Sequence, residues 1–172
     1  SQIVFQDLVS SEGWVVPDVD ELLHEGLMYG AIIHSNSWGD DTTNYTVRTA
    51  TFDAFARQVP WSLAFIAPGN NAGDVLEPAN GRNVVAVGAT VKSTSQELWS
   101  PSARGPLHDG RDGIFVIAPG QNIMSAKADG NDSTNNAELR PSSGTSMSTP
   151  SASGATAIIQ QMYQDGWFSN QV

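Results

Sequence analysis

The chain has 172 residues, a length that suffices for one domain with a hydrophobic core. Its 18 acidic and 8 basic residues give a formal net charge of −10, which argues against nucleic acid or an anionic membrane surface as a partner. The sequence contains no cysteine, so disulfides, thiol catalysis and thiolate zinc sites are excluded. No apolar run is long enough to span a membrane.

The first half of the chain alternates short apolar runs with helical patterns. Residues 3–9, IVFQDLV, are predicted to form a strand, and residues 17–30 a helix that Asp18 caps. Residues 31–39, AIIHSNSWG, follow as a second strand. Residues 44–59 are predicted to form a second helix with one apolar face.

The second half supplies three more apolar strands, at residues 62–70, 83–90 and 113–120, and a last helix at residues 148–163. These strands are continuously apolar rather than alternating, which suits a sheet covered on both faces. The β-α-β-α-β order predicts an α/β fold with a doubly wound, mostly parallel sheet and helices on both faces. Ligands of such sheets bind beyond the carboxyl ends of the strands.

Three polar segments are expected at that edge of the sheet: SNSWG, APGNNAG and GTSMSTP. Each has an ordinary interpretation. Gly39 can simply end a strand, Asn70 can be a turn residue, and Ser146 can cap the helix that follows it. Their occurrence together favours a functional interpretation.

The three segments resemble, in their order, motifs of the subtilisin-like serine proteases, the subtilases. GTSMSTP resembles the nucleophile motif, APGNNAG the segment with the oxyanion asparagine, and NSWG the substrate-binding strand. VVAVGAT, SARGP and VIAPG also follow the family's order, so the resemblance runs from about residue 3 to residue 163. IIHSNSWGDD and SARGPLHDGR look most similar to the oxidation-resistant alkaline subtilases.

The resemblance implies a serine endopeptidase in which Ser146 is the nucleophile and Asn70 donates a hydrogen bond to the oxyanion. A helix N-terminus suits this chemistry, because its unpaired amides and positive dipole end stabilise developing negative charge. A polypeptide substrate would pair with the strand edge and place one side chain in a pocket. The implied substrate-binding residues are Ser37, Trp38, Gly39, Ala67, Pro68, Gly69 and Leu76.

The floor of that pocket is expected near Leu76 and Glu77. A leucine side chain there would partly fill the space that relatives with glycine leave open. A carboxylate there would disfavour acidic substrate residues. The pocket is therefore expected to take medium-sized apolar or basic side chains in preference to tryptophan or glutamate.

The chain departs from the family because the motifs of the catalytic aspartate and histidine, which precede the serine in subtilases, are absent. His24, His34 and His108 lie in other contexts and are expected to be bystanders. We therefore expect residues 1–172 to be the C-terminal portion of a subtilisin-like peptidase domain. This chain alone is expected to be inactive, and the missing N-terminal part of the domain is its expected partner.

The implied chemistry requires no cofactor and no metal. Structural calcium is common in the family, and the loop 128–136 carries Asp129, Asn131 and Asp132 as oxygen ligands. The loop lacks EF-hand spacing, so a solvated turn is the favoured interpretation and a calcium site the alternative. The expected location is extracellular.

Two other functions are consistent with the sequence. One is a non-catalytic, subtilase-like module that binds peptides. The other is a doubly wound fold that binds a small ligand and has no peptidase ancestry, in which Asn70 and Ser146 would not lie together.

Overall fold

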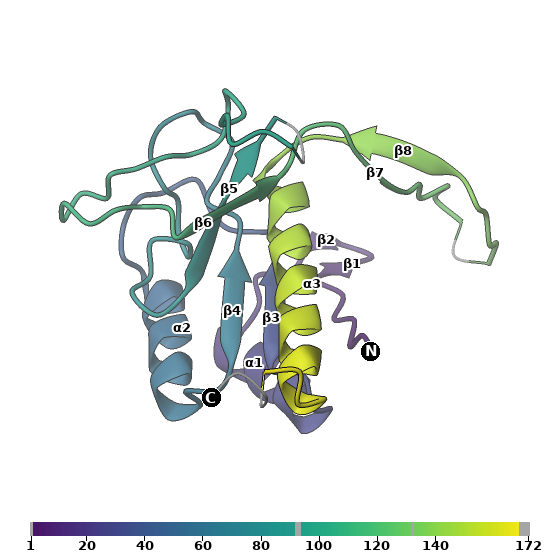
Figure 1. The fold of residues 1–172 in the computed structure, drawn as a ribbon, viewed down its shortest axis with the longest axis horizontal. Helices are drawn as coiled ribbons and strands as arrows, with labels where there is room; N and C mark the ends of the chain where they lie inside the picture. The colour runs from purple at the N-terminus through teal and green to yellow at the C-terminus, as the bar shows by residue number, and fades with distance from the viewer. Residues whose placement is uncertain (1, 92–93, 132, 169–172) are drawn as a thin grey trace.

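The computed structural model describes residues 2–91, 94–131 and 133–168, and a parallel sheet of four strands lies at its centre (Figure 1). The strands run in the order β3-β4-β5-β6, and every neighbouring pair is parallel. Their bounds are Ile33–Asn36 for β3, Leu63–Ile66 for β4, Val85–Thr90 for β5 and Val116–Pro119 for β6. The predicted α/β fold with a parallel sheet is confirmed.

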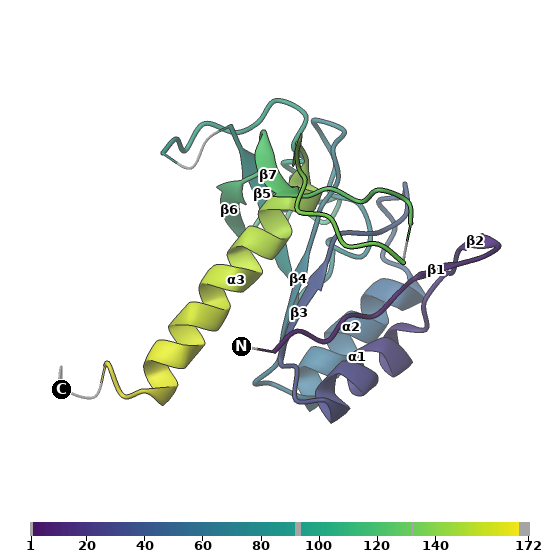
Figure 2. The same ribbon diagram turned by 90° about the vertical axis from the view of Figure 1, so that its right-hand side faces the viewer.

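Two helices cover one face of the sheet and a third covers the other (Figure 2). The first two are α1 (Val19–Met28) and α2 (Val47–Gln58). The third is α3 (Thr145–Gln164), which packs against all four strands. The predicted cap of α1 is confirmed, because the Asp18 side chain accepts hydrogen bonds from the first-turn amides. No helix within the described ranges is long and apolar enough to cross a membrane.

The core has two parts because successive strand residues point to opposite faces of the sheet. Ala64 and Ile66 of β4 belong to the larger cluster, which also holds Phe52 and Phe55 of α2. Phe65, between them, belongs to a smaller cluster on the α3 side. This alternation explains why the strands are apolar throughout.

The observed strands are shorter than the predicted ones, and the difference lies mainly at their ends. Residues 37–39 and 67–70 were expected to continue β3 and β4, but they leave the sheet as loops at its carboxyl edge. Helix α3 begins three residues earlier than predicted, at Thr145 rather than residue 148. As a result, Ser146 lies inside the first turn of α3.

The predicted strand at residues 3–9 is wrong for most of its length. Only Val9–Ser10 (β1) is a strand, and it pairs with Gly13–Trp14 (β2) in a small antiparallel hairpin. Ile3 and Phe5 are 90% and 84% exposed, and the segment before β1 runs beside α1 rather than in the sheet (Figure 2). An apolar run without a neighbouring strand has no backbone partner with which to form a ladder.

A second antiparallel hairpin, formed by β7 (Ile123–Ala126) and β8 (Leu139–Ser142), was not predicted. It extends from the body as an arm (Figure 1). Met124 and Leu139 are exposed on it, so the arm has no buried apolar face. Without such a face the sequence carries no strong strand pattern, and Pro141 further weakens the signal.

Candidate active site

The N-terminus of α3 meets the loop that follows β4. Asn70 lies in that loop, and its Oδ1 accepts hydrogen bonds from the backbone N–H and the hydroxyl of Thr145, at 2.9 and 3.1 Å. Because two donors converge on Oδ1, the amide orientation is fixed and Nδ2 is the end left to donate. The structure thus brings together the two segments that the sequence predicts to be neighbours.

Ser146 is partly buried in the first turn of α3, next to Thr145. Among the described residues its hydroxyl makes no hydrogen bond, and its backbone N–H lies in the turn where helix amides lack an intrahelical acceptor. A Cβ built on Gly144 would lie 3.5 Å from both Nδ2 and Oδ1 of Asn70 and 3.7 Å from the Ser146 amide nitrogen. The Asn70 side-chain amide and the Ser146 backbone amide therefore lie close together, beside Gly144.

Pro150 leaves a carbonyl of α3 free to contact the residue that follows β3. A proline at this position has no N–H, so the carbonyl of Ser146 lacks its usual partner four residues later in the helix. That carbonyl instead accepts a hydrogen bond from the Ser37 hydroxyl at 3.0 Å. The segment predicted to bind substrate is thereby attached to the residue predicted to be the nucleophile.

The loop after β4 is held on both sides by backbone hydrogen bonds. The amide of Ala67 donates to the carbonyl of Asn36 at the end of β3, and the amide of Leu76 donates to the carbonyl of Pro68, both at 2.9 Å. Gly69 has a φ of +115°, and a Cβ there would lie 2.9 Å from Leu76 Cδ1. The Leu76 side chain therefore packs directly on the segment predicted to form the pocket wall.

The Glu77 carboxylate is buried and paired rather than exposed at the floor of an open pocket. Glu77 is only 1% exposed, and its carboxylate accepts hydrogen bonds from Arg48 at 2.6 Å and from the Thr46 hydroxyl at 2.8 Å. A buried charge needs such partners, and they compensate it locally. The carboxylate therefore belongs to the buried interior, next to the segment predicted to form the pocket.

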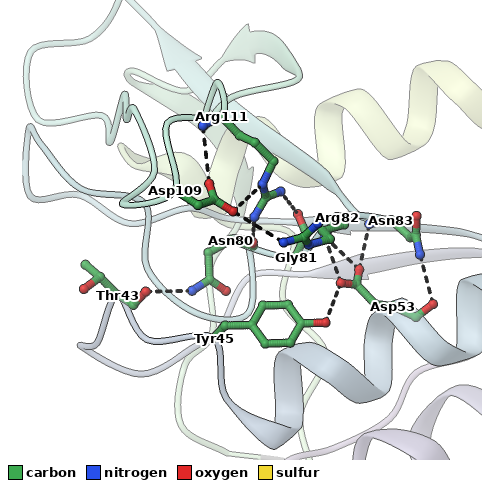
Figure 3. A network of polar contacts seen from close by, with 9 residues as sticks. All are labelled: Thr43, Tyr45, Asp53, Asn80, Gly81, Arg82, Asn83, Asp109 and Arg111. Carbon is green, nitrogen blue, oxygen red and sulfur yellow. Dashed lines mark hydrogen bonds and ion pairs between the residues drawn. The ribbon is translucent and has the colours of Figure 1, made fainter.

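A second buried carboxylate, Asp53 of α2, holds the end of the same loop (Figure 3). It accepts hydrogen bonds from the backbone amides of Arg82 and Asn83, at 2.8 and 2.6 Å, and from the Tyr45 hydroxyl at 2.8 Å. Arg111 joins from a third loop by donating to the carbonyl of Asn80 at 3.0 Å. Sequence reasoning missed this network, although an aspartate on the apolar face of a helix is a signal for a buried polar contact.

None of the three histidines lies beside Ser146 in the described structure. His34 points to the α1–α2 face, where it contacts Gly26 and stacks edge-on against Phe55, whereas α3 covers the opposite face. His24 lies on α1 and bonds to the Asp20 carbonyl. His108 is exposed in the loop that contains Asp109.

The burial of His34 predicts acid-sensitive stability. Burial lowers the pKa of His34 from 6.5, and its Nε2 has no partner among the described residues. The unfolded chain therefore takes up the proton first, so the free energy of unfolding falls as the pH drops below about 6.5. His34→Leu is expected to remove this component, measured by urea unfolding between pH 7 and pH 5.

The matched control for this prediction is His108→Gln, since His108 is exposed. Carboxylates whose pKa is lowered by hydrogen bonds, such as Asp109 with Arg111, lose their contribution only below 3.8, outside this window. An unchanged pH dependence in His34→Leu, or an equal change in His108→Gln, contradicts the prediction.

In the loop 128–136, the alternative calcium site, the Asp129 carboxylate is hydrogen-bonded to residues of the same loop. Asp129 accepts hydrogen bonds from the Thr134 hydroxyl at 2.7 Å and from the amide of Asn131 at 2.9 Å. The hydrogen bond from Thr134 is the main reason that the pKa of Asp129 is lowered. Asp132 lies outside the described residues. The part of the chain that the structure describes contains no group of three acidic or histidine side chains placed to hold a metal ion.

Comparison with known proteins gives consistent matches to proteases. The Extracellular protease of Xanthomonas campestris pv. campestris is 30% identical over 133 residues, which are 76% of this chain and 21% of the relative. Subtilisin Savinase of Lederbergia lenta is 29% identical over 144 residues, which are 83% of this chain and 46% of the relative. The chain thus spans less than half the length of these relatives.

The fold is also found among solved structures. The Prenylagaramide maturation protease PagA matches with a TM-score of 0.71 and 24% identity, over 92% of this chain and 55% of that one. The sequence profile of the Subtilase family matches residues 10–172. A match over nearly the whole chain shows the family, and the parallel sheet with its covering helices agrees with it: the chain belongs to the subtilase family of serine peptidases.

Proposed function

We propose that the chain is part of a serine endopeptidase in which Ser146 is the nucleophile and Asn70 the oxyanion donor. The observation that carries the proposal is the pair of hydrogen bonds from Thr145 to Asn70 Oδ1. They leave Nδ2 of Asn70 as a donor, and the amide of Ser146 lies close to it beside Gly144. That arrangement suits a tetrahedral intermediate whose oxyanion needs two donors beside the attacking oxygen.

In the proposed reaction the Ser146 oxygen attacks the carbonyl carbon of a peptide bond while a base takes its proton. The carbonyl oxygen becomes an oxyanion near Asn70 and the amide of Ser146. The C–N bond then breaks, the leaving amine takes the proton from the protonated base, and an ester remains on Ser146. Water hydrolyses this ester in the reverse sequence of steps.

The base is proposed to come from outside this chain. His24, His34 and His108 lie away from Ser146, and relatives extend well beyond the matched region. We propose that residues 1–172 are the C-terminal portion of the catalytic domain and that its other portion carries the aspartate and histidine. This chain alone would then be inactive, because an unassisted serine hydroxyl is a poor nucleophile.

The other portion of the domain is proposed to pack beside β3 and α3. Among the described strands, β3 has a neighbour on one side only, so its second edge is free to pair. The outer face of α3 exposes Ile158, Ile159 and Tyr163, which an apolar partner would bury. The end of β3 lies beside the N-terminus of α3, where the Ser37 hydroxyl donates to the Ser146 carbonyl, so a segment that pairs with the β3 edge would also approach Ser146.

The proposed substrate is a polypeptide in extended conformation that pairs with Ser37, Trp38 and Gly39. Backbone pairing of this kind gives affinity with little choice of sequence, so a pocket must supply the selectivity. The proposed wall of that pocket is Ala67, Pro68 and Gly69. No cofactor is proposed for the chemistry. An extracellular location is proposed from the name of the Xanthomonas relative.

The packing of Leu76 on Gly69 leads to a prediction about the pocket. In the complete protein, Leu76→Gly is expected to raise kcat/KM for substrates with phenylalanine or tryptophan before the scissile bond by about tenfold relative to valine. The reason is that the leucine side chain occupies space next to the proposed wall. A peptide library that varies this position measures the change.

The control is Leu98→Gly, since Leu98 is a partly exposed leucine in a different groove, beside Phe115. It is expected to leave the preference as it is in the parent protein. If Leu76→Gly also keeps the parent preference for the residue before the scissile bond, Leu76 does not line the pocket.

The proposed function is tested by assaying the complete protein, with the sequence that flanks this chain, on an unfolded protein such as casein. New amino termini are the expected result. Binding of peptides without cleavage would support the alternative of a non-catalytic, peptide-binding module. The upstream sequence separates the two in advance, because the enzyme requires an aspartate motif and a histidine motif there.

A further inference from the structure

Glu77 lies where three segments of the chain meet. Its Oε1 accepts a hydrogen bond from Arg48 and its Oε2 from the Thr46 hydroxyl, both at the start of α2. Its backbone N–H donates to the carbonyl of Thr42 at 2.9 Å, and it forms a β-bridge with Asp40. A Cβ on Gly39 would collide with the Glu77 carbonyl oxygen.

Arg48 connects Glu77 to the segment 38–40. Its Nη1 donates to Asp40 Oδ2 at 2.8 Å as well as to Glu77 Oε1 at 2.6 Å. Its guanidinium lies 5.8 Å from the centre of the Trp38 ring. One arginine, with 15% of its side chain exposed, therefore contacts the segment 38–40 and the segment 76–77 together.

These two segments are the two proposed sides of the substrate cleft. Residues 37–39 are the proposed strand edge for the substrate backbone. Leu76, next to Glu77, packs on Gly69 of the proposed pocket wall. The backbone hydrogen bond from Ala67 to Asn36 joins the two sides at one end. Contacts that run through Glu77 and Arg48 join them a second time, behind the surface that a substrate would touch.

We propose that the Arg48–Glu77 pair is a positioning element that fixes the strand edge 37–39 relative to the pocket wall 67–69 and thereby sets selectivity for the substrate side chain before the scissile bond. This inference rests on the proposed function. Neither residue touches substrate. A shift of about 1 Å in such supporting groups is enough to cost roughly 10²-fold in rate, so the spacing has a measurable effect.

Asp53 supplies a matched control, because it is also a buried carboxylate that ties α2 to the same loop (Figure 3). Its partners are the amides of Arg82 and Asn83 and the hydroxyl of Tyr45. Among the described residues, Asp53 makes no hydrogen bond or ion pair with the segment 37–40. Its loss destabilises the loop in a similar way but leaves the connection between the two sides of the cleft.

The experiment compares Glu77→Gln, Arg48→Met and Asp53→Asn in the complete protein. The ratio of kcat/KM for phenylalanine to that for valine before the scissile bond is expected to change about tenfold in the first two variants and less than about twofold in Asp53→Asn. Arg48→Lys keeps the positive charge but not the fork of donors, and it is expected to fold and to change the ratio in the same direction by a smaller factor.

Amide hydrogen exchange provides a readout that needs no activity. Glu77→Gln and Arg48→Met are expected to speed amide exchange at positions 76 and 77 by roughly tenfold and to leave positions 82 and 83 unchanged. Asp53→Asn is expected to speed exchange at positions 82 and 83 and to leave positions 76 and 77 unchanged. If the complete protein cleaves no peptide, the proposed function is contradicted, but the exchange rates still test whether Arg48 and Glu77 position the two segments. The inference is overturned if all three variants change the kcat/KM ratio and the amide exchange rates equally. It is also overturned if Glu77→Gln and Arg48→Met change neither quantity.

Discussion

Replacing Ser146 by alanine in the complete protein is expected to lower kcat for peptide hydrolysis by about 10⁶-fold, the largest effect of any substitution in the chain. Ser146 lies in the first turn of α3, next to the Thr145 that bonds to Asn70, and in the proposed mechanism no acyl-enzyme forms without its hydroxyl. KM is expected to change little, because the substrate backbone is held elsewhere. The measurement is steady-state hydrolysis of a chromogenic peptide.

Ser151→Ala is the matched control for that substitution. Ser151 lies on the same helix and is exposed, and within the described ranges its hydroxyl bonds only to the Met147 carbonyl. It is expected to retain the parent rate. A Ser146→Ala variant that keeps ordinary turnover would mean that another residue is the nucleophile.

Replacing Asn70 by alanine is expected to lower kcat by about 10²–10³-fold. The substitution removes Nδ2 as a donor to the oxyanion, while the amide of Ser146 remains. It also removes the acceptor for the amide and hydroxyl of Thr145, so a thermal unfolding curve must accompany the kinetics. The effect is expected in kcat with little change in KM, because the lost interaction is made in the transition state.

Asn71→Ala is the neighbouring control. Asn71 is exposed in the same loop, and in the part of the chain that the structure describes its side chain accepts a hydrogen bond only from the amide of Gly73. It is expected to change kcat by less than about threefold. A comparable loss in both variants would point to loop disorder rather than to a lost oxyanion donor.

The sheet was predictable because its strands are apolar on both faces. Phe65 and Ile66 point to opposite clusters, so burial leaves a continuous apolar run in the sequence. The hairpin arm and the segment before β1 were not predicted correctly, because they are exposed and burial does not shape their sequences. The arm carries Met124 and Leu139 in solvent, and the run that contains Ile3 and Phe5 is apolar without being a strand. Burial on both faces leaves a continuous apolar run in the sequence, but the exposed run at residues 3–5 shows that such a run does not require a buried strand.

The candidate site was predictable as motifs but not as contacts. Asn70 and Ser146 could be singled out from their local sequences, and their proximity followed from the carboxyl edge of a parallel sheet. The role of Glu77 could not, because its charge is compensated by Arg48, which lies 29 positions away in the sequence. The sequence around Glu77 contains no motif that indicates Arg48 as its partner, so the carboxylate was expected near the pocket floor.

The central claim is that Ser146 is the nucleophile, and the most direct measurement is covalent labelling of the complete protein with a fluorophosphonate. Such a reagent transfers its phosphonyl group to a serine oxygen, with loss of fluoride, only where a base and an oxyanion site activate that serine. Peptide mass mapping is predicted to find the adduct on Ser146, and none in Asn70→Ala over the same interval. Labelling of a different residue in a protein that hydrolyses peptides would contradict the account.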